Sequence, residues 1–115
     1  MKAALNGVPQ LSTVDGWWEE GFEGNNGWAI EPEVDDDNGM NTANRLYELL
    51  EQEVVPRFYD RDKNELPRRW LTMMKHAIRV GGQQFTARRM VEQYARAYYA
   101  PAILGDSLPD DPPLA

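Results

Sequence analysis

Residues 67–82 decide the fold, and they read Pro67-Arg68-Arg69-Trp70-Leu71-Thr72-Met73-Met74-Lys75-His76-Ala77-Ile78-Arg79-Val80-Gly81-Gly82. Apolar side chains recur in this stretch at the i, i+3, i+4, i+7, i+8 spacing of one helix face, and they are Trp70, Met73, Met74, Ala77 and Ile78. Proline suits the first turn of a helix, and paired glycines favour its end. The pattern predicts an amphipathic helix that begins at Pro67 and stops at Gly81.

A second helix is predicted before this one. Asn41 or Thr42 can cap it, and Pro56 is expected to end it. Its apolar face consists of Leu46, Leu49, Leu50 and Val54.

A third helix is predicted after the central one, with Thr86 as its cap. Phe85 before the cap and Met90 four residues into the helix can form a hydrophobic staple. The apolar face then continues to Pro101 through Val91, Tyr94, Ala95 and Tyr98.

The N-terminal region is irregular and rich in glycine, tryptophan and acids. We expect a helical turn over residues 3–5, short strands over 10–14 and 28–30, a loop over 21–27 and an acidic connector over 33–39. The chain therefore divides into three parts. Residues 1–39 hold turns, short strands and loops, residues 40–102 hold the helices, and residues 103–115, rich in proline and aspartate, form a disordered tail. The predicted class is α/β, mostly α.

Composition excludes several kinds of protein. A chain of 115 residues with 42% apolar residues is enough for one small globular domain. The absence of cysteine excludes disulfides, zinc-thiolate sites and cysteine nucleophiles. The sequence has no signal peptide pattern and no apolar run near the ~20 residues of a membrane span, so a cytoplasmic location without a membrane partner is expected.

Charge is unevenly distributed around the net value of −7. Nine acids and no base lie between Lys2 and Arg45, whereas most of the basic residues follow Arg45. Six arginines flank the apolar stripes of the last two helices: Arg68, Arg69, Arg79, Arg88, Arg89 and Arg96. They could form a basic face for phosphate or nucleic acid. We favour the alternative that they are polar helix faces, some paired with acids of residues 19–37, and we expect no nucleic-acid partner.

Two acidic motifs suggest a metal site but lack the full pattern. Residues 60–64 open like a calcium loop, yet Glu65 stands where glycine is required and Leu71 where a bidentate glutamate belongs. A solvated turn is the better interpretation. Three consecutive acids at 35–37 cannot all face one ion, so no metal site is predicted. His76 has no serine or cysteine partner in a triad pattern, and no catalytic residue is assigned.

Tryptophan is abundant, at positions 17, 18, 28 and 70. Trp17 and Trp18 lie beside glycines and acids and could stack on a sugar ring. The commoner role of such residues is to anchor an irregular segment on a core.

Lys2 lies at the start of a small-residue turn that is followed by a strand. A lysine in such a place can reach a cleft at the end of a sheet, and a half-buried amine can form a Schiff base with an aldehyde cofactor. Because no cap or turn precedes this opening, we expect the chain to be a segment of a larger α/β protein.

Several motifs carry a resemblance to a known family, and they are Met1-Lys2-Ala3-Ala4-Leu5-Asn6-Gly7, Leu11-Ser12 with Asp15-Gly16-Trp17-Trp18, Asn25-Asn26-Gly27-Trp28-Ala29-Ile30, Leu46-Tyr47-Glu48-Leu49-Leu50 and Val55-Pro56-Arg57-Phe58-Tyr59-Asp60-Arg61. Through these motifs, residues 1 to about 102 resemble the C-terminal region of the bacterial α-glucan phosphorylases, the glycogen and maltodextrin phosphorylases of glycosyltransferase family 35.

The resemblance implies a fold, a reaction and one site residue. The fold would be one edge of the second Rossmann-like domain of a two-domain GT-B enzyme, with one or two short strands and closing amphipathic helices. The enzyme would use phosphate to release glucose 1-phosphate from α-1,4-glucans. Lys2 matches the lysine that carries pyridoxal phosphate in this family, and the 5′-phosphate of the cofactor acts in proton transfer and electrostatic stabilisation. Asn6, Gly7, Asp15 and Gly16 match supporting positions around that pocket.

The sequence also departs from the family. The Gly-rich stretch before the methionine, the basic residues that hold both phosphates and the N-terminal domain are absent. We therefore expect no phosphorylase activity from this chain by itself. Two other hypotheses remain open: a small helical module that binds a partner, including the missing enzyme portion, through the Trp70, Met73, Met74 and Ile78 stripe, and a carbohydrate-binding remnant that uses Trp17 and Trp18.

Overall fold

The computed structural model of the chain describes residues 1–32 and 37–105. The predicted acidic connector lies mostly outside these residues, and so does the tail from residue 106 onward.

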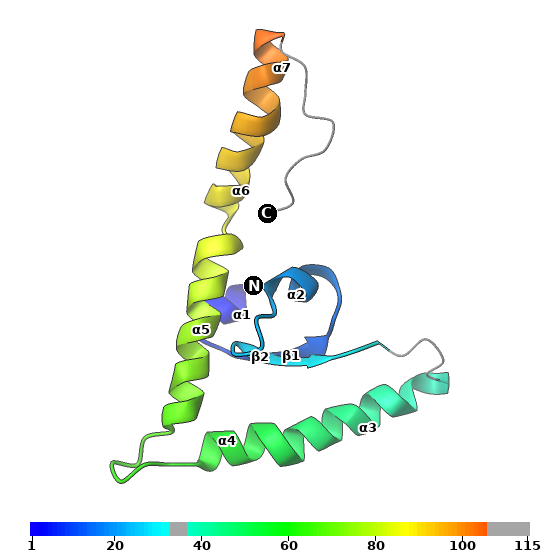
Figure 1. Cartoon of the computed structure of the whole chain (residues 1–115), viewed down its shortest axis with the longest axis vertical. Helices are drawn as coiled ribbons and strands as arrows, with labels where there is room; N and C mark the ends of the chain where they lie inside the picture. The colour runs from blue at the N-terminus through cyan, green and yellow to red at the C-terminus, as the bar shows by residue number, and fades with distance from the viewer. Residues whose placement is uncertain (33–36, 106–115) are drawn as a thin grey trace.

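A two-stranded parallel sheet lies near the N-terminus (Figure 1). Strand β1 (Gln10–Thr13) pairs with β2 (Gly27–Ile30), with Leu11 opposite Trp28. Parallel strands need a crossover connection, and here it contains helix α2 (Gly16–Gly21). Both strand predictions are confirmed, and the fold agrees with the predicted α/β class that is mostly α.

Helix α2 is absent from the sequence prediction because glycines at both ends give it weak helix propensity. Tertiary packing stabilises it instead. The Trp18 side chain is only 1% exposed, and its indole Nε1 donates a hydrogen bond to the Trp28 carbonyl oxygen at 3.1 Å. A satisfied buried indole therefore ties the crossover to β2.

The second helix is longer than predicted. It runs without a break through α3 (Met40–Leu49), the π-helical turn η2 (Leu50–Val54) and α4 (Val55–Tyr59). It follows the 3-10 turn η1 (Asp37–Gly39), and neither Asn41 nor Thr42 is its cap, because Gly39 in the left-handed conformation precedes its first residue. Pro56 does not end it. The Val55 amide donates to the Leu50 carbonyl, and this wider turn accommodates a proline that lacks an N–H.

The central helix α5 (Arg68–Gln84) follows Pro67 and passes through both glycines that were expected to stop it. Gly81 is buried because α1 (Lys2–Leu5) packs on it. A β-carbon at Gly81 would lie 3.5 Å from the Ala4 Cβ. Helix α1 therefore packs against Gly81 at ordinary van der Waals distance, and this tertiary contact is not visible in the local sequence.

The third predicted helix consists of α6 (Ala87–Tyr94), the π-helical turn η3 (Ala95–Tyr99) and α7 (Ala100–Leu104). Its predicted cap is confirmed, since Thr86 Oγ1 accepts a hydrogen bond from the Arg89 amide at 3.3 Å. Pro101 is again accommodated by a π-helical turn, in which the Ala100 amide donates to the Ala95 carbonyl.

The core is small and lies where the sheet meets two helices. Residues Trp28, Ile30, Leu49 and Met73 are buried together, with Trp70 packed against them. Figure 1 shows the sheet, α1 and α2 in the angle between two rods, one formed by α3 to α4 and the other by α5 to α7. Among the described residues, no helix is both long enough and apolar enough to cross a membrane.

Candidate functional site

Lys2 lies on α1, and α1 is fixed to the central helix. Ala4 is buried against Gly81, and the Asn6 side-chain amide donates to the Lys2 carbonyl at 2.8 Å. Gly7 then ends the helix in the left-handed conformation, with φ of 79°, where a side chain would meet Met74. These contacts hold the backbone of Lys2 in place while its side chain remains exposed.

A groove of about 590 Å³ begins at Lys2 and runs between α1, α2 and the start of α6. The Trp17 and Phe85 rings form part of its wall, with their centroids 5.2 Å apart in an edge-on arrangement. The groove thus combines a primary amine with an aromatic surface. Sequence reasoning identified Lys2 and missed the groove, because Trp17 and Phe85 meet only after α2 forms.

Arg89 and Glu20 supply the other charged side chains of this groove. Arg89 Nη1 donates to the Gln93 Oε1 at 2.8 Å, whereas its Nε is buried and has no hydrogen-bond partner. The groove therefore offers an amine and a guanidinium, which are the groups that an aldehyde cofactor with a phosphate requires.

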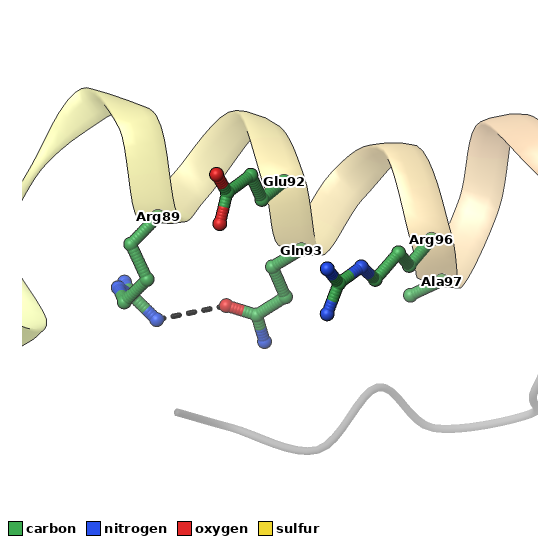
Figure 2. Close-up of a pocket in the computed structure, with 5 residues that line it drawn as sticks. All are labelled: Arg89, Glu92, Gln93, Arg96 and Ala97. Atoms are coloured by element: carbon green, nitrogen blue, oxygen red, sulfur yellow. Dashed lines mark hydrogen bonds between the residues drawn. The ribbon is translucent and has the colours of Figure 1, made fainter.

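A second depression, of about 430 Å³, lies farther along the same rod (Figure 2). Its lining residues Arg89, Glu92, Gln93, Arg96 and Ala97 all come from α6 and η3. Because one helix supplies all of the lining that comes from residues 1–32 and 37–105, whereas three elements line the Lys2 groove, we prefer the Lys2 groove as the candidate site.

The motif at residues 60–64 forms the predicted turn. Asp62 Oδ1 accepts hydrogen bonds from the Asn64 and Leu66 amides at 2.8 and 3.0 Å, and Oδ2 pairs with Arg68 Nε at 2.6 Å. The Arg68 hydrogen bond, followed by the two amides, holds the pKa of Asp62 below its usual range. Within the described residues, no group of three or more acids or histidines could hold a metal ion.

The predicted pairing of an arginine with an N-terminal acid is confirmed for Arg79. Its Nη2 lies 2.5 Å from the Glu23 Oε2, which joins α5 to the loop after α2. Other arginines pair closer in sequence, such as Arg88 with Glu92 four residues away. His76 is half-buried on α5.

The tryptophans mainly anchor the fold. Trp18 is buried, and Trp28 packs on Trp70 with their ring centroids 5.9 Å apart. Burial makes Trp18 inaccessible to a sugar ring, whereas Trp17 borders the Lys2 groove.

Most residues of the Trp70, Met73, Met74 and Ile78 stripe, which was proposed to bind a partner, pack against other parts of this chain. Met73 is buried, and Trp70 and Met74 are half-buried. Ile78 remains exposed beside Gly7.

Comparison with known proteins finds similarity over most of the chain. It is 45% identical over 101 residues to a glycogen phosphorylase of Aquifex aeolicus and 47% identical over 107 residues to a glycogen phosphorylase of Mycobacterium tuberculosis. This chain is a homologue of the glycogen phosphorylases. A maltodextrin phosphorylase of Thermococcus litoralis is 44% identical over 108 residues, so the predicted resemblance is confirmed.

These matches cover 87–90% of this phosphorylase homologue and only 12–15% of the length of its relatives. No family profile and no solved structure matches the chain.

Proposed function

We propose that this chain is the C-terminal part of an α-glucan phosphorylase, the enzyme that uses phosphate to release glucose 1-phosphate from α-1,4-glucans. The observation that carries the proposal is the identity of 44–47% to glycogen and maltodextrin phosphorylases over nearly the whole chain. The βαβ unit formed by β1, α2 and β2 suits the edge of a Rossmann-like domain of a GT-B fold, and α3 to α7 are its closing helices.

The open shape of the chain supports a role as part of a larger enzyme. Its radius of gyration is 18.8 Å, against about 13 Å for a compact domain of this length. Apolar side chains such as Tyr99, Ile103 and Leu104 are exposed along the outer end of the second rod. Such a surface is stabilised when the remainder of an enzyme covers it.

Lys2 is the residue that would hold pyridoxal phosphate, through its side-chain amine. The groove beside it fits that group, because it presents an aromatic wall from Trp17 and Phe85 and a cation from Arg89. When bound, the cofactor supplies a phosphate group for proton transfer and charge stabilisation. The part of this chain is to fix the attachment point on α1 and to shield one side of the groove from water.

The attachment can be tested on the chain itself. Incubation with pyridoxal phosphate and reduction with borohydride would label reactive lysines, and peptide mass spectrometry would locate the label. We expect Lys2 to be labelled in preference to Lys63 and Lys75, because only Lys2 borders the groove. Lys2→Arg should abolish the main label and Lys75→Arg should retain it. Equal labelling of all three lysines would contradict the assignment.

Catalysis by the chain alone is not expected. Phosphorolysis requires two phosphates and a glucan in one water-poor cleft, whereas the groove holds two cations and is open to solvent. Incubation with maltodextrin and phosphate should therefore yield no glucose 1-phosphate. Formation of that product would overturn the view that the remainder of the enzyme is required.

A further inference from the structure

A separate pocket of about 270 Å³ lies between α4, the first turns of α5 and the loop after α2. Among the residues that the structure describes, none lines both this pocket and the Lys2 groove. Its basic side chains are Arg57, Arg69 and His76, which come from two helices.

The central helix brings two of these basic groups to one face. Arg69 and His76 are seven residues apart, or about two turns, so their side chains lie above one another. Met73 lies between them and forms a buried apolar floor. Thr72 is also in the lining, but its hydroxyl already donates to the Arg68 carbonyl at 3.0 Å. The donors available from α5 are therefore the guanidinium and the imidazole.

Arg57 provides the opposing wall and is held by two contacts. Its guanidinium carbon lies 5.7 Å from the centroid of the Trp28 ring, and its Nη2 lies 3.1 Å from Glu53 Oε2. Its side chain is 23% exposed, and its Nε is buried without a hydrogen-bond partner. Arg57 is thus fixed in position, and within the described part of the chain one of its five donors forms a hydrogen bond.

The third wall is the loop that carries Gly24 and Asn25. Asn26, which is 2% exposed, donates from Nδ2 to the Gly21 carbonyl at 2.6 Å and accepts at Oδ1 from the Glu23 amide at 2.9 Å. The Glu23 side chain is paired with Arg79 on α5. These bonds hold the loop against α5, so the Asn25 side of the pocket is formed before any ligand arrives.

We propose that this pocket binds a small phosphate-bearing anion, either inorganic phosphate or a phosphate monoester. Guanidinium groups form strong charge-assisted hydrogen bonds with phosphate oxygens. The described lining holds two guanidiniums and no carboxylate, and Glu53 pairs with Arg57 from outside it. Packing on Trp28 and pairing with Glu53 account for the position of Arg57 but of no other basic residue in the pocket. They do not explain why Arg69 and His76 face the same cavity.

The test is a titration of the ¹⁵N-labelled chain with sodium phosphate at constant ionic strength, followed by NMR. We expect saturable shifts of the Gly24 and Asn25 amides and of the Arg57 and Arg69 side-chain Nε–H signals. Arg69→Gln removes one charged donor from an exposed position, so it should weaken binding about tenfold without unfolding the chain. Arg96→Gln makes the same charge change outside the pocket and should leave the affinity unchanged.

A second titration with phenyl phosphate distinguishes the two ligand sources. Tighter binding than inorganic phosphate would favour a monoester, and weaker binding would favour the free ion. The proposal is overturned if the shifts do not saturate, if Arg69→Gln and Arg96→Gln behave alike, or if the shifts centre on Lys2 and Arg89. That last result would place the anion in the Lys2 groove and leave the proposed function intact.

Discussion

Two glycines of this chain, Gly27 and Gly81, differ in the space that is available for a side chain. Gly27 begins β2 where a β-carbon would meet the Gln10 carbonyl oxygen and lie 2.9 Å from the Trp18 ring. Gly81 lies within α5, where the nearest atoms to such a carbon would be 3.5 Å away. The first position excludes a side chain, whereas the second has room for a methyl group.

Gly27→Ala should therefore destabilise the fold by about 2–3 kcal/mol, because backbone and a buried indole must both move. Gly81→Ala is the matched control and should be neutral or stabilising by up to about 1 kcal/mol, because alanine is the better helix former. Urea unfolding of both variants measures this difference. Little or no loss in Gly27→Ala would contradict this expectation and would show that β2 shifts to accept the methyl group.

The lowered pKa of Asp62 predicts that the stability of the fold decreases at acidic pH. Because its pKa is lowered in the folded chain, its contribution is present above the unfolded pKa of about 4 and is lost as pH falls through the folded value. Thermal melting between about pH 2 and pH 6 should show this loss. The Asp62→Asn variant should have a flatter profile, and an unchanged profile would show that other carboxylates cause the acid sensitivity.

At the scale of elements, periodicity predicted what local sequence controls. The presence of three helices at these places, the Thr86 cap and both strands were confirmed, because spacing and capping chemistry act over a few residues. The apolar face of the third helix stays largely exposed, with Val91 56% exposed. The predicted ends of two helices were wrong, because local stop signals alone do not determine where these helices end. Pro56 and Gly81 are stop signals in isolation, yet the helix from α3 to α4 passes Pro56 through a π-helical turn, and the central helix continues past Gly81, where α1 packs against it.

The candidate site was also predictable only in part. The resemblance in the sequence pointed to Lys2, but the walls of its groove depend on α2, whose glycine-flanked sequence is a poor helix former. The pocket around Arg57 was equally hidden, because Arg57 and His76 come from helices whose crossing no local pattern specifies.

The α6 cap gives a prediction at this scale. Thr86→Ala removes the hydrogen bond to the Arg89 amide and should cost about 1 kcal/mol of local stability. Amide exchange in α6 should then accelerate about fivefold while α5 remains protected. Thr72→Ala, on an exposed face of α5, should not accelerate exchange in α6. Acceleration by both variants would argue against a capping role.

The molecule as a whole measures 60 × 44 × 17 Å, which describes two rods around a small core rather than a closed globule. Its second rod ends in a helix with little tertiary cover: Ile103 is 85% exposed and Leu104 is 75% exposed. In a complete phosphorylase we expect other parts of the enzyme to cover this end.

The isolated chain should therefore self-associate in a concentration-dependent way on gel filtration. Replacing Ile103 and Leu104 together by serine should reduce the association, because it removes the most exposed apolar side chains of α7. Leu66→Ser removes an exposed leucine in a turn and serves as the control. A monomer at every concentration would indicate a self-sufficient module and would weaken the proposal of an incomplete enzyme.

The π-helical turn before Pro56 also has a geometric consequence for ligand binding. Such a turn amounts to one extra residue in an α-helix, and one residue corresponds to a rotation of about 100°. Pro56→Ala without any deletion would favour regular α-helical winding at the same chain length, and this would rotate everything after the turn. Arg57 would then leave the Trp28 ring and the phosphate pocket. The direction in which Arg57 points around the helix axis is thus set by the π-helical turn that precedes it, although no residue of that turn lines the pocket.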